Sequence, residues 1–121
     1  MLGTFVLSEG YYDAYFTKAQ QIRKLLVTQT KEIFKEFDVL LLPTAPTTAF
    51  DAGSMEKDPI AMYLADIYTV YANLTGTPAI SLPLFKHSNG MPFGLQVIAD
   101  NFNELTLFNF SQVLMSDYKK Y

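Results

Sequence analysis

The stretch from Asp58 to Phe85 restricts the fold of this 121-residue chain more than any other. It reads as a capped helix, a Gly-Thr-Pro turn and a strand from Pro78 to Leu84. Asp58 is a favourable N-cap, and Pro59 suits the first helical position because an N–H has no helical partner there. Helical spacing of the apolar residues predicts one packed helix with the face Ile60, Tyr63, Leu64, Ile67, Val70, Tyr71 and Leu74.

A polar stripe runs beside that apolar face. Its members are three or four residues apart, which puts them in one row along a helix: Met62, Asp66, Thr69 and Asn73. The carboxylate of Asp66 in such a row could bind a ligand ammonium group. Most helical carboxylates are simply solvated, so the spacing by itself favours an exposed helix surface.

A long helix is expected before this region, capped by Ser8 and continuing almost to Asp38. At about 27 residues and about 1.5 Å per residue it would be roughly 40 Å long. A compact domain of this chain length has a radius of gyration of only about 14 Å. The helix therefore either bends or lies across a larger body, and the apolar start Met1–Leu7 also resembles the interior of a longer chain.

Two further strands and a last helix complete the prediction. Val39–Leu42 is a short apolar run, typical of a strand buried on both faces in a partly parallel sheet. Phe93–Ala99 should pair with Pro78–Leu84 through the Asn-Gly hairpin between them. A helix from about Asn103 to Tyr118 is expected to bury Leu105, Leu107, Phe108, Phe110, Val113, Leu114 and Met115. The prediction is an α/β fold, with a mixed sheet of about three strands and three main helices.

Composition excludes several classes of function. The net charge of −3 provides no basic surface for a phosphate backbone, so a role in RNA chemistry would need another protein to hold the RNA. No cysteine and a single histidine leave little scope for a thiol nucleophile or a zinc site. No apolar run approaches the roughly 20 residues of a spanning helix, and the start lacks the layout of a signal peptide. We expect no membrane partner and a cytoplasmic location.

The residues that could carry catalysis are few. His87 falls in the exposed hairpin without an obvious partner, and Ser81 lies within a predicted buried strand with no Gly-x-Ser-x-Gly elbow. The six glycines form no phosphate-binding loop. Three threonines follow the Val39–Leu42 strand, where they either satisfy loop backbone or contact a ligand: Thr44, Thr47 and Thr48. We therefore expect no catalytic residue and no metal ligand in this chain, and Asp66 is the candidate for substrate binding.

Several segments together resemble one family. They are Asp38–Phe50 (DVLLLPTAPTTAF), Asp58–Thr69 (DPIAMYLADIYT) and Asn73–Pro83 (NLTGTPAISLP), and the match continues in Gly10–Tyr15 and Gly90–Ile98. The first and third are similar to amidase-signature enzymes in general. The second resembles more narrowly the A subunits of glutamyl-tRNA(Gln)/aspartyl-tRNA(Asn) amidotransferases, and residues 1–121 resemble their C-terminal part.

The resemblance implies a larger α/β glutaminase whose Ser–cis-Ser–Lys triad is absent from these residues. In that family the freed ammonia passes to the B member of the complex, which activates the mischarged tRNA with ATP and Mg²⁺, and the complex also contains a C member. An arginine that holds the glutamine carboxylate would fall just before Met1. Asp66 matches the acid that contacts the α-ammonium group of glutamine. The chain is expected to need no cofactor itself and to be inactive alone.

Two other interpretations stay open. The shared motifs also allow a part of a different amidase-signature hydrolase that acts on small amides, although the Asp58–Thr69 segment argues against it. A free-standing α/β binding module without catalysis is the other possibility.

Overall fold

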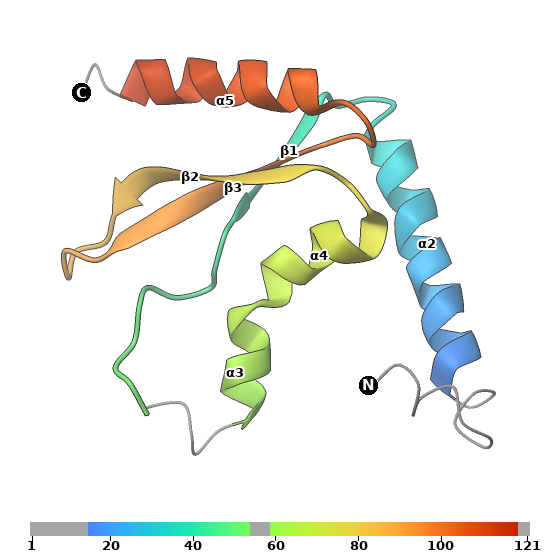
Figure 1. Cartoon of the computed structure of the whole chain (residues 1–121), viewed down its shortest axis with the longest axis horizontal. Helices are drawn as coiled ribbons and strands as arrows, with labels where there is room; N and C mark the ends of the chain where they lie inside the picture. Colours follow the sequence, from blue (N-terminus) through green and yellow to red (C-terminus); the bar gives the residue numbers. More distant parts are fainter. Residues whose placement is uncertain (1–14, 54–58, 119–121) are drawn as a thin grey trace.

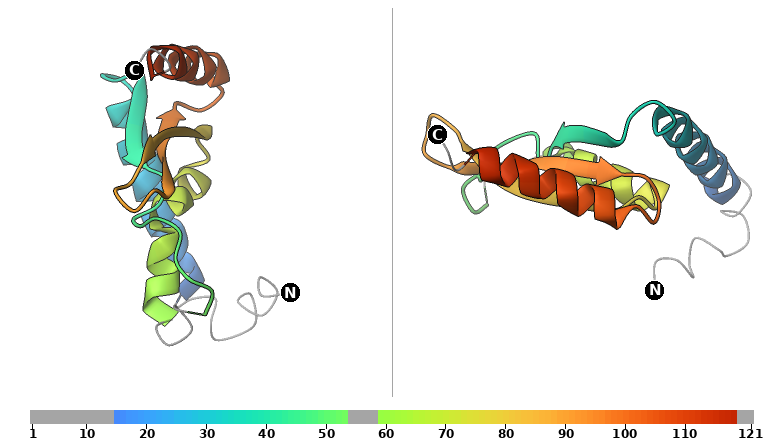
Figure 2. Two further views of the ribbon diagram at one scale, coloured as in Figure 1. Left: turned by 90° about the vertical axis from the view of Figure 1, so that its left-hand side faces the viewer. Right: turned by 90° about the horizontal axis from the view of Figure 1, so that it is seen from above.

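The computed structural model describes residues 15–53 and 59–118, which form an α/β arrangement around a small sheet (Figure 1). Along the chain the elements are α2 (Thr17–Ile33), β1 (Val39–Pro43), α3 (Pro59–Ala65), α4 (Ile67–Thr75), β2 (Ala79–Lys86), β3 (Pro92–Ala99) and α5 (Glu104–Tyr118). Helix α5 lies over one side of the sheet, and α3 and α4 lie on the other side (Figures 1 and 2). The predicted α/β class and three-stranded sheet are confirmed.

The sheet has the strand order β1-β3-β2 and is antiparallel at both pairings. The hairpin predicted from Asn89-Gly90 joins β2 and β3 as expected, with Gly90 at a positive φ of 81°. The prediction of a partly parallel sheet was wrong. Strand β1 is an edge strand that pairs only with β3 among the described strands, and Leu41 is exposed. A short apolar run is compatible with a strand buried on both faces and with a partly exposed edge strand, so the sequence pattern does not distinguish the two.

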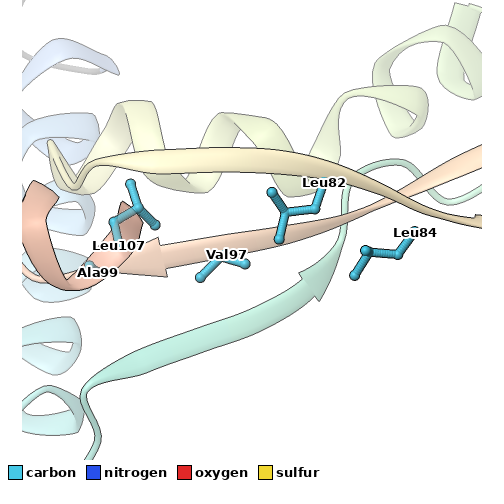
Figure 3. Packing of buried hydrophobic residues seen from close by; sticks show 5 residues of the cluster. All are labelled: Leu82, Leu84, Val97, Ala99 and Leu107. Atoms are coloured by element: carbon cyan, nitrogen blue, oxygen red, sulfur yellow. The ribbon is translucent and has the colours of Figure 1, made fainter. Parts of the chain in front are cut away.

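The core lies between the sheet and α5. Five buried residues from β2, β3 and α5 pack together there: Leu82, Leu84, Val97, Ala99 and Leu107 (Figure 3). Phe110, Leu114 and Met115 contact this cluster, as predicted. Leu105, Phe108 and Val113 were also expected to be buried, but they are exposed because only one side of α5 faces the sheet.

Helix α2 ends earlier than the sequence suggested. It ends at Ile33, because the next residues form a tight turn in which the N–H of Lys35 donates to Glu32 O at 3.2 Å and that of Glu36 to Ile33 O at 3.1 Å. This turn brings the chain into β1 without a helix that continues to Asp38. The Ser8 cap lies outside the described residues. No helix in the described ranges is both long and apolar enough to cross a membrane.

The region after Pro59 forms two helices where one was predicted. Helix α3 begins at Pro59, as expected, while Asp58 lies outside the described residues. Asp66 separates α3 from α4, with φ −103° and ψ 5°. Helix α4 ends at Gly76, whose φ of 73° forms the left-handed cap that glycine favours. The two short helices therefore point in different directions (Figure 1).

Most of the predicted apolar face of α3 and α4 is exposed in the described part of the chain, although Tyr71 is half-buried beside α2. Ile60 is 68% exposed and Tyr63 is 83% exposed, and Leu64, Ile67 and Val70 are exposed as well. The prediction of a packed face was thus wrong for these residues. Periodicity shows that a helix is amphipathic, but it does not show whether the packing surface belongs to the same polypeptide segment.

Candidate functional site

Asp66 lies at the break between α3 and α4, and hydrogen bonds hold its backbone in place. Its carbonyl oxygen accepts bonds from the backbone N–H of Thr69 (3.1 Å), the N–H of Val70 (3.1 Å) and the Thr69 hydroxyl (3.0 Å). The carboxylate makes no capping bond to α4, and no cation of the described residues pairs with it. The backbone is thus fixed, while the exposed carboxylate remains available to a ligand.

Asp66 borders a cavity of about 290 Å³, which we call the Asp66 pocket. The helix side of this pocket comes from Met62, Ala65 and Asp66, and the loop after β1 forms the other side with Ala45, Thr47, Thr48, Ala49 and Phe50. The structure therefore brings together two features that the sequence analysis treated separately, the helix acid and two of the three threonines. An acid beside hydroxyl groups is suited to bind an ammonium group.

A second cavity of about 290 Å³ lies between α4 and the sheet, and we call it the Gln96 pocket. Residues of α4, of all three strands or their ends, and of the Gly-Thr-Pro turn line it: Thr44, Thr69, Ala72, Asn73, Thr77, Ala79, Ile80, Ser81 and Gln96. The predicted polar stripe is thus divided at the helix break. Met62 and Asp66 line one pocket, while Thr69 and Asn73 line the other.

Gly94 shapes the sheet side of the Gln96 pocket. The Thr44 and Ser81 hydroxyls, which come from opposite sides of the central strand β3, form a hydrogen bond of 2.7 Å. This bond passes over Gly94: a Cβ atom there would lie 2.8 Å from Thr44 Oγ1 and still closer to Ser81 Oγ. Only a residue without a side chain permits the two hydroxyls to meet.

Two residues considered for catalysis, His87 and Ser81, are both exposed. His87 is exposed in the hairpin, as predicted, and within the described residues the hydrogen bonds of its Nδ1 go to its neighbours Ser88 and Asn89. Its side chain also lines a cavity with Thr47 and Thr48 of the loop after β1. Ser81 lies in a strand, as predicted, but it is exposed and bonded to Thr44 instead of being buried. Across residues 15–53 and 59–118, no three His, Asp or Glu side chains come together as a metal site would require.

Two residues of the site were missed by the sequence analysis, Gln96 and Gly94. A signal existed for Gln96, because it interrupts an apolar strand between Leu95 and Val97, where a polar residue indicates the opposite face of the sheet. For Gly94 the signal was a glycine inside a strand, which indicates close approach of another group. The Gln96 pocket itself could not be predicted, since it depends on how α4 lies against the sheet.

Comparison with known proteins identifies the family. Residues 1–108 match the family model named Amidase. The chain is 48% identical over 122 aligned positions to the A subunit of glutamyl-tRNA(Gln) amidotransferase of Streptococcus gordonii, and the match covers 99% of this chain and 25% of that protein. It is 54% identical to the same-named protein of Clostridium botulinum, where 90% of the chain matches 22% of the relative.

A solved structure agrees with these sequence relatives. The crystal structure of the glutamyl-tRNA(Gln) amidotransferase A subunit from Thermotoga maritima matches 89% of this chain and 24% of its own length, with 47% identity and a TM-score of 0.77. The chain thus spans about a quarter of the length of the relatives that it matches. With the family model matching most of its residues, this chain belongs to the amidase family.

Proposed function

We propose that this chain is part of the glutaminase component of a tRNA-dependent amidotransferase, where it contributes to the glutamine site. The complete component would release ammonia from glutamine for the conversion of Glu-tRNA(Gln) to Gln-tRNA(Gln). The observation that carries the proposal is the free carboxylate of Asp66 in a pocket with threonine hydroxyls. The names of relatives that are 48% and 54% identical support the same conclusion.

Asp66 is proposed to bind the α-ammonium group of glutamine. A charge-assisted hydrogen bond of this kind contributes about 1.5–3 kcal/mol. The three bonds to the Asp66 backbone oxygen fix the backbone of the residue before the ligand arrives, so little backbone entropy is lost on binding. Thr47 and Thr48 lie across the pocket, where their hydroxyls can accept the remaining ammonium hydrogens.

The rest of the reaction is assigned to other parts of the complex. In this proposal residues 1–121 are the C-terminal part of an amidase-signature domain, and the Ser–Ser–Lys residues that attack glutamine belong to the rest of that domain. The B and C members of the amidotransferase complex would be partners, and the mischarged tRNA would be held through the B member in the cytoplasm. ATP and Mg²⁺ would act in that same partner, so this chain is proposed to bind no cofactor.

A chimeric enzyme tests the role of Asp66. The chain replaces the matching C-terminal quarter of the Thermotoga maritima protein, and glutamine hydrolysis is measured with Asp66 and with Asp66→Asn. Loss of a charge-assisted bond should raise KM for glutamine about tenfold or more. The control is Asp38→Asn, which changes the same charge at an exposed position remote from both pockets.

The proposal also predicts a dependence on the substrate amine. In the Asp66 chimera, glutaramic acid, which lacks the α-amino group, should be hydrolysed far less well than glutamine, and Asp66→Asn should remove most of this preference. An unchanged KM for glutamine in the Asp66→Asn chimera would contradict the proposed role. So would a chimera that folds but does not hydrolyse glutamine.

A further inference from the structure

A third cavity, of about 480 Å³, lies between the loop after β1 and the β2–β3 hairpin, and we call it the His87 pocket. The described residues that line it are Pro43, Ala45, Pro46, Thr47, Thr48, His87 and Phe93. It shares three loop residues with the Asp66 pocket but none of the helix residues of that pocket. A cavity of about 300–1,000 Å³ with mostly apolar walls and a few polar groups is typical of a small-molecule site.

The apolar part of the His87 pocket suits a flat ring. Phe93 is 38% exposed, and its ring stacks on that of Phe85 with centroids 5.2 Å apart and an interplanar angle of 20°. Phe85 does not line the pocket, so it covers one face of Phe93 and leaves another part of the ring to the cavity. Aromatic rings attract one another in offset-stacked or edge-to-face arrangements. A ligand ring can therefore extend the Phe85–Phe93 pair, with the rings of Pro43 and Pro46 as the other apolar walls.

Asn89 holds the polar part of the pocket together. Its backbone N–H donates to His87 Nδ1 at 3.5 Å, which leaves the hydrogen of a neutral imidazole on Nε2. Its side-chain Nδ2 donates to Thr48 Oγ1 at 3.3 Å, so the Thr48 hydroxyl keeps its own hydrogen for another acceptor. The exposed Thr47 hydroxyl can donate as well. The polar groups of the pocket are thus suited to a ligand that accepts hydrogen bonds.

The two segments that form the pocket carry no negative charge. Residues 39–50 and 79–99 contain no Asp or Glu, and their only ionisable side chains are Lys86 and His87. Asp66 lines the neighbouring pocket and not this one. An anion that enters therefore gains attraction from the hairpin, whereas an ammonium group would lose hydration without meeting an acid in these segments.

We propose that the His87 pocket binds a small organic anion that carries a flat ring. The ring contacts Pro43, Pro46 and Phe93, and the anionic group accepts hydrogen bonds from His87 Nε2 and the Thr48 hydroxyl. Glutamine has no ring, so this ligand is of a different class from the substrate proposed for the Asp66 pocket. The inference does not depend on the proposed function.

Titration of the 121-residue chain with benzoate at constant pH, followed by NMR, tests the inference. His87 is the only histidine of the chain, so its imidazole signals need no further assignment. Benzoate should shift these signals saturably. Acetate, which lacks the ring, and benzyl alcohol, which lacks the charge, should each bind at least about fivefold more weakly.

Variants test the two polar contacts. Backbone amide signals of the hairpin and of the loop after β1 report binding in each of them. His87→Gln, at an exposed position, should weaken benzoate binding about fivefold to tenfold, and Thr48→Val, which removes only the hydroxyl, about threefold. The matched control is Lys31→Gln, which removes a cation from the exposed surface of α2 and should leave the affinity unchanged.

Three results would overturn the inference. One is the absence of a saturable benzoate shift at His87, and another is equal affinity for benzoate and benzyl alcohol. The third is a folded His87→Gln variant that binds benzoate as tightly as the unchanged chain. Asp66→Asn should not weaken benzoate binding, so failure of the glutamine proposal and failure of this one are distinguishable.

Discussion

At the scale of single residues, Gly94 has the most specific structural requirement. Its missing side chain allows Thr44 and Ser81 to form their hydrogen bond above the central strand. The bond joins the loop after β1 to β2, two segments that are 37 residues apart in the sequence. It also forms part of the boundary of the Gln96 pocket. The absence of a side chain at Gly94 thus permits a hydrogen bond that helps to form the wall of the Gln96 pocket.

Gly94→Ala should destabilise the protein by about 1–3 kcal/mol, because the added methyl group must displace two hydroxyls and the adjacent Leu82 carbonyl lies at 3.4 Å. Urea unfolding measures the loss. The double variant Gly94→Ala/Ser81→Ala removes the closest contact and should recover about 1 kcal/mol relative to additive effects. Strict additivity of the two changes would show that the contact with Ser81 is not the cause.

At the scale of elements, the attachment of α2 to α4 is polar. The Thr30 hydroxyl donates its hydrogen to Leu26 O at 2.7 Å, so in its 2.5 Å contact with Tyr71 it is Tyr71 that donates. Arg23 Nε donates to Leu74 O at 2.9 Å, near the end of α4. These bonds fix α2 beside α4, although most large apolar side chains of α2 are exposed.

Tyr71→Phe should lower the free energy of unfolding by about 1 kcal/mol, since it deletes one hydrogen bond while Thr30 keeps its bond to Leu26. Amide hydrogen exchange should accelerate in α2 more than in β3, because the bond joins α2 to α4 and not to the sheet. Tyr68→Phe, in the same helix, provides the matched control and should change stability by less than about 0.5 kcal/mol. Equal effects of the two substitutions would contradict this account.

At the scale of the whole molecule, the described residues form a small core and leave several apolar faces uncovered. The buried hydrophobic cluster lies on the α5 side of the sheet, whereas large apolar residues of α2, α3 and α4 are exposed. The chain spans about a quarter of the length of its relatives. In the function proposed above, the remaining three quarters of the protein would cover these apolar faces.

The isolated 121 residues should show no glutaminase turnover. The reason is chemical: the proposal assigns the attacking serine and its lysine to the remainder of the domain, and Asp66 can bind a substrate but does not by itself form an acyl intermediate. Ammonia release from glutamine by the purified chain is the measurement. If the purified chain hydrolysed glutamine and Asp66→Ala abolished this activity, the assignment of the attacking serine to the rest of the domain would be contradicted.

Short-range patterns in the sequence were enough to predict most of the local structure and the family. Helix and strand periods, Pro59 at a helix start, the Asn-Gly hairpin and the motif around Asp66 each depend on a few neighbouring residues, so they can be read without a structure. Asp66 became the candidate for substrate binding through the resemblance of its segment to the family, since its spacing by itself favoured a solvated helix surface.

Which surfaces meet could be seen only in the three-dimensional arrangement of the elements. The break at Asp66 divided one predicted polar stripe between two pockets, the antiparallel register put Gln96 and Ser81 on the same face, and Gly94 allowed Thr44 to reach Ser81. These outcomes depend on the relative positions of segments distant in sequence. The physical reason is that periodicity defines the face of an element, whereas packing energy, which is spread over many weak contacts, determines what that face contacts.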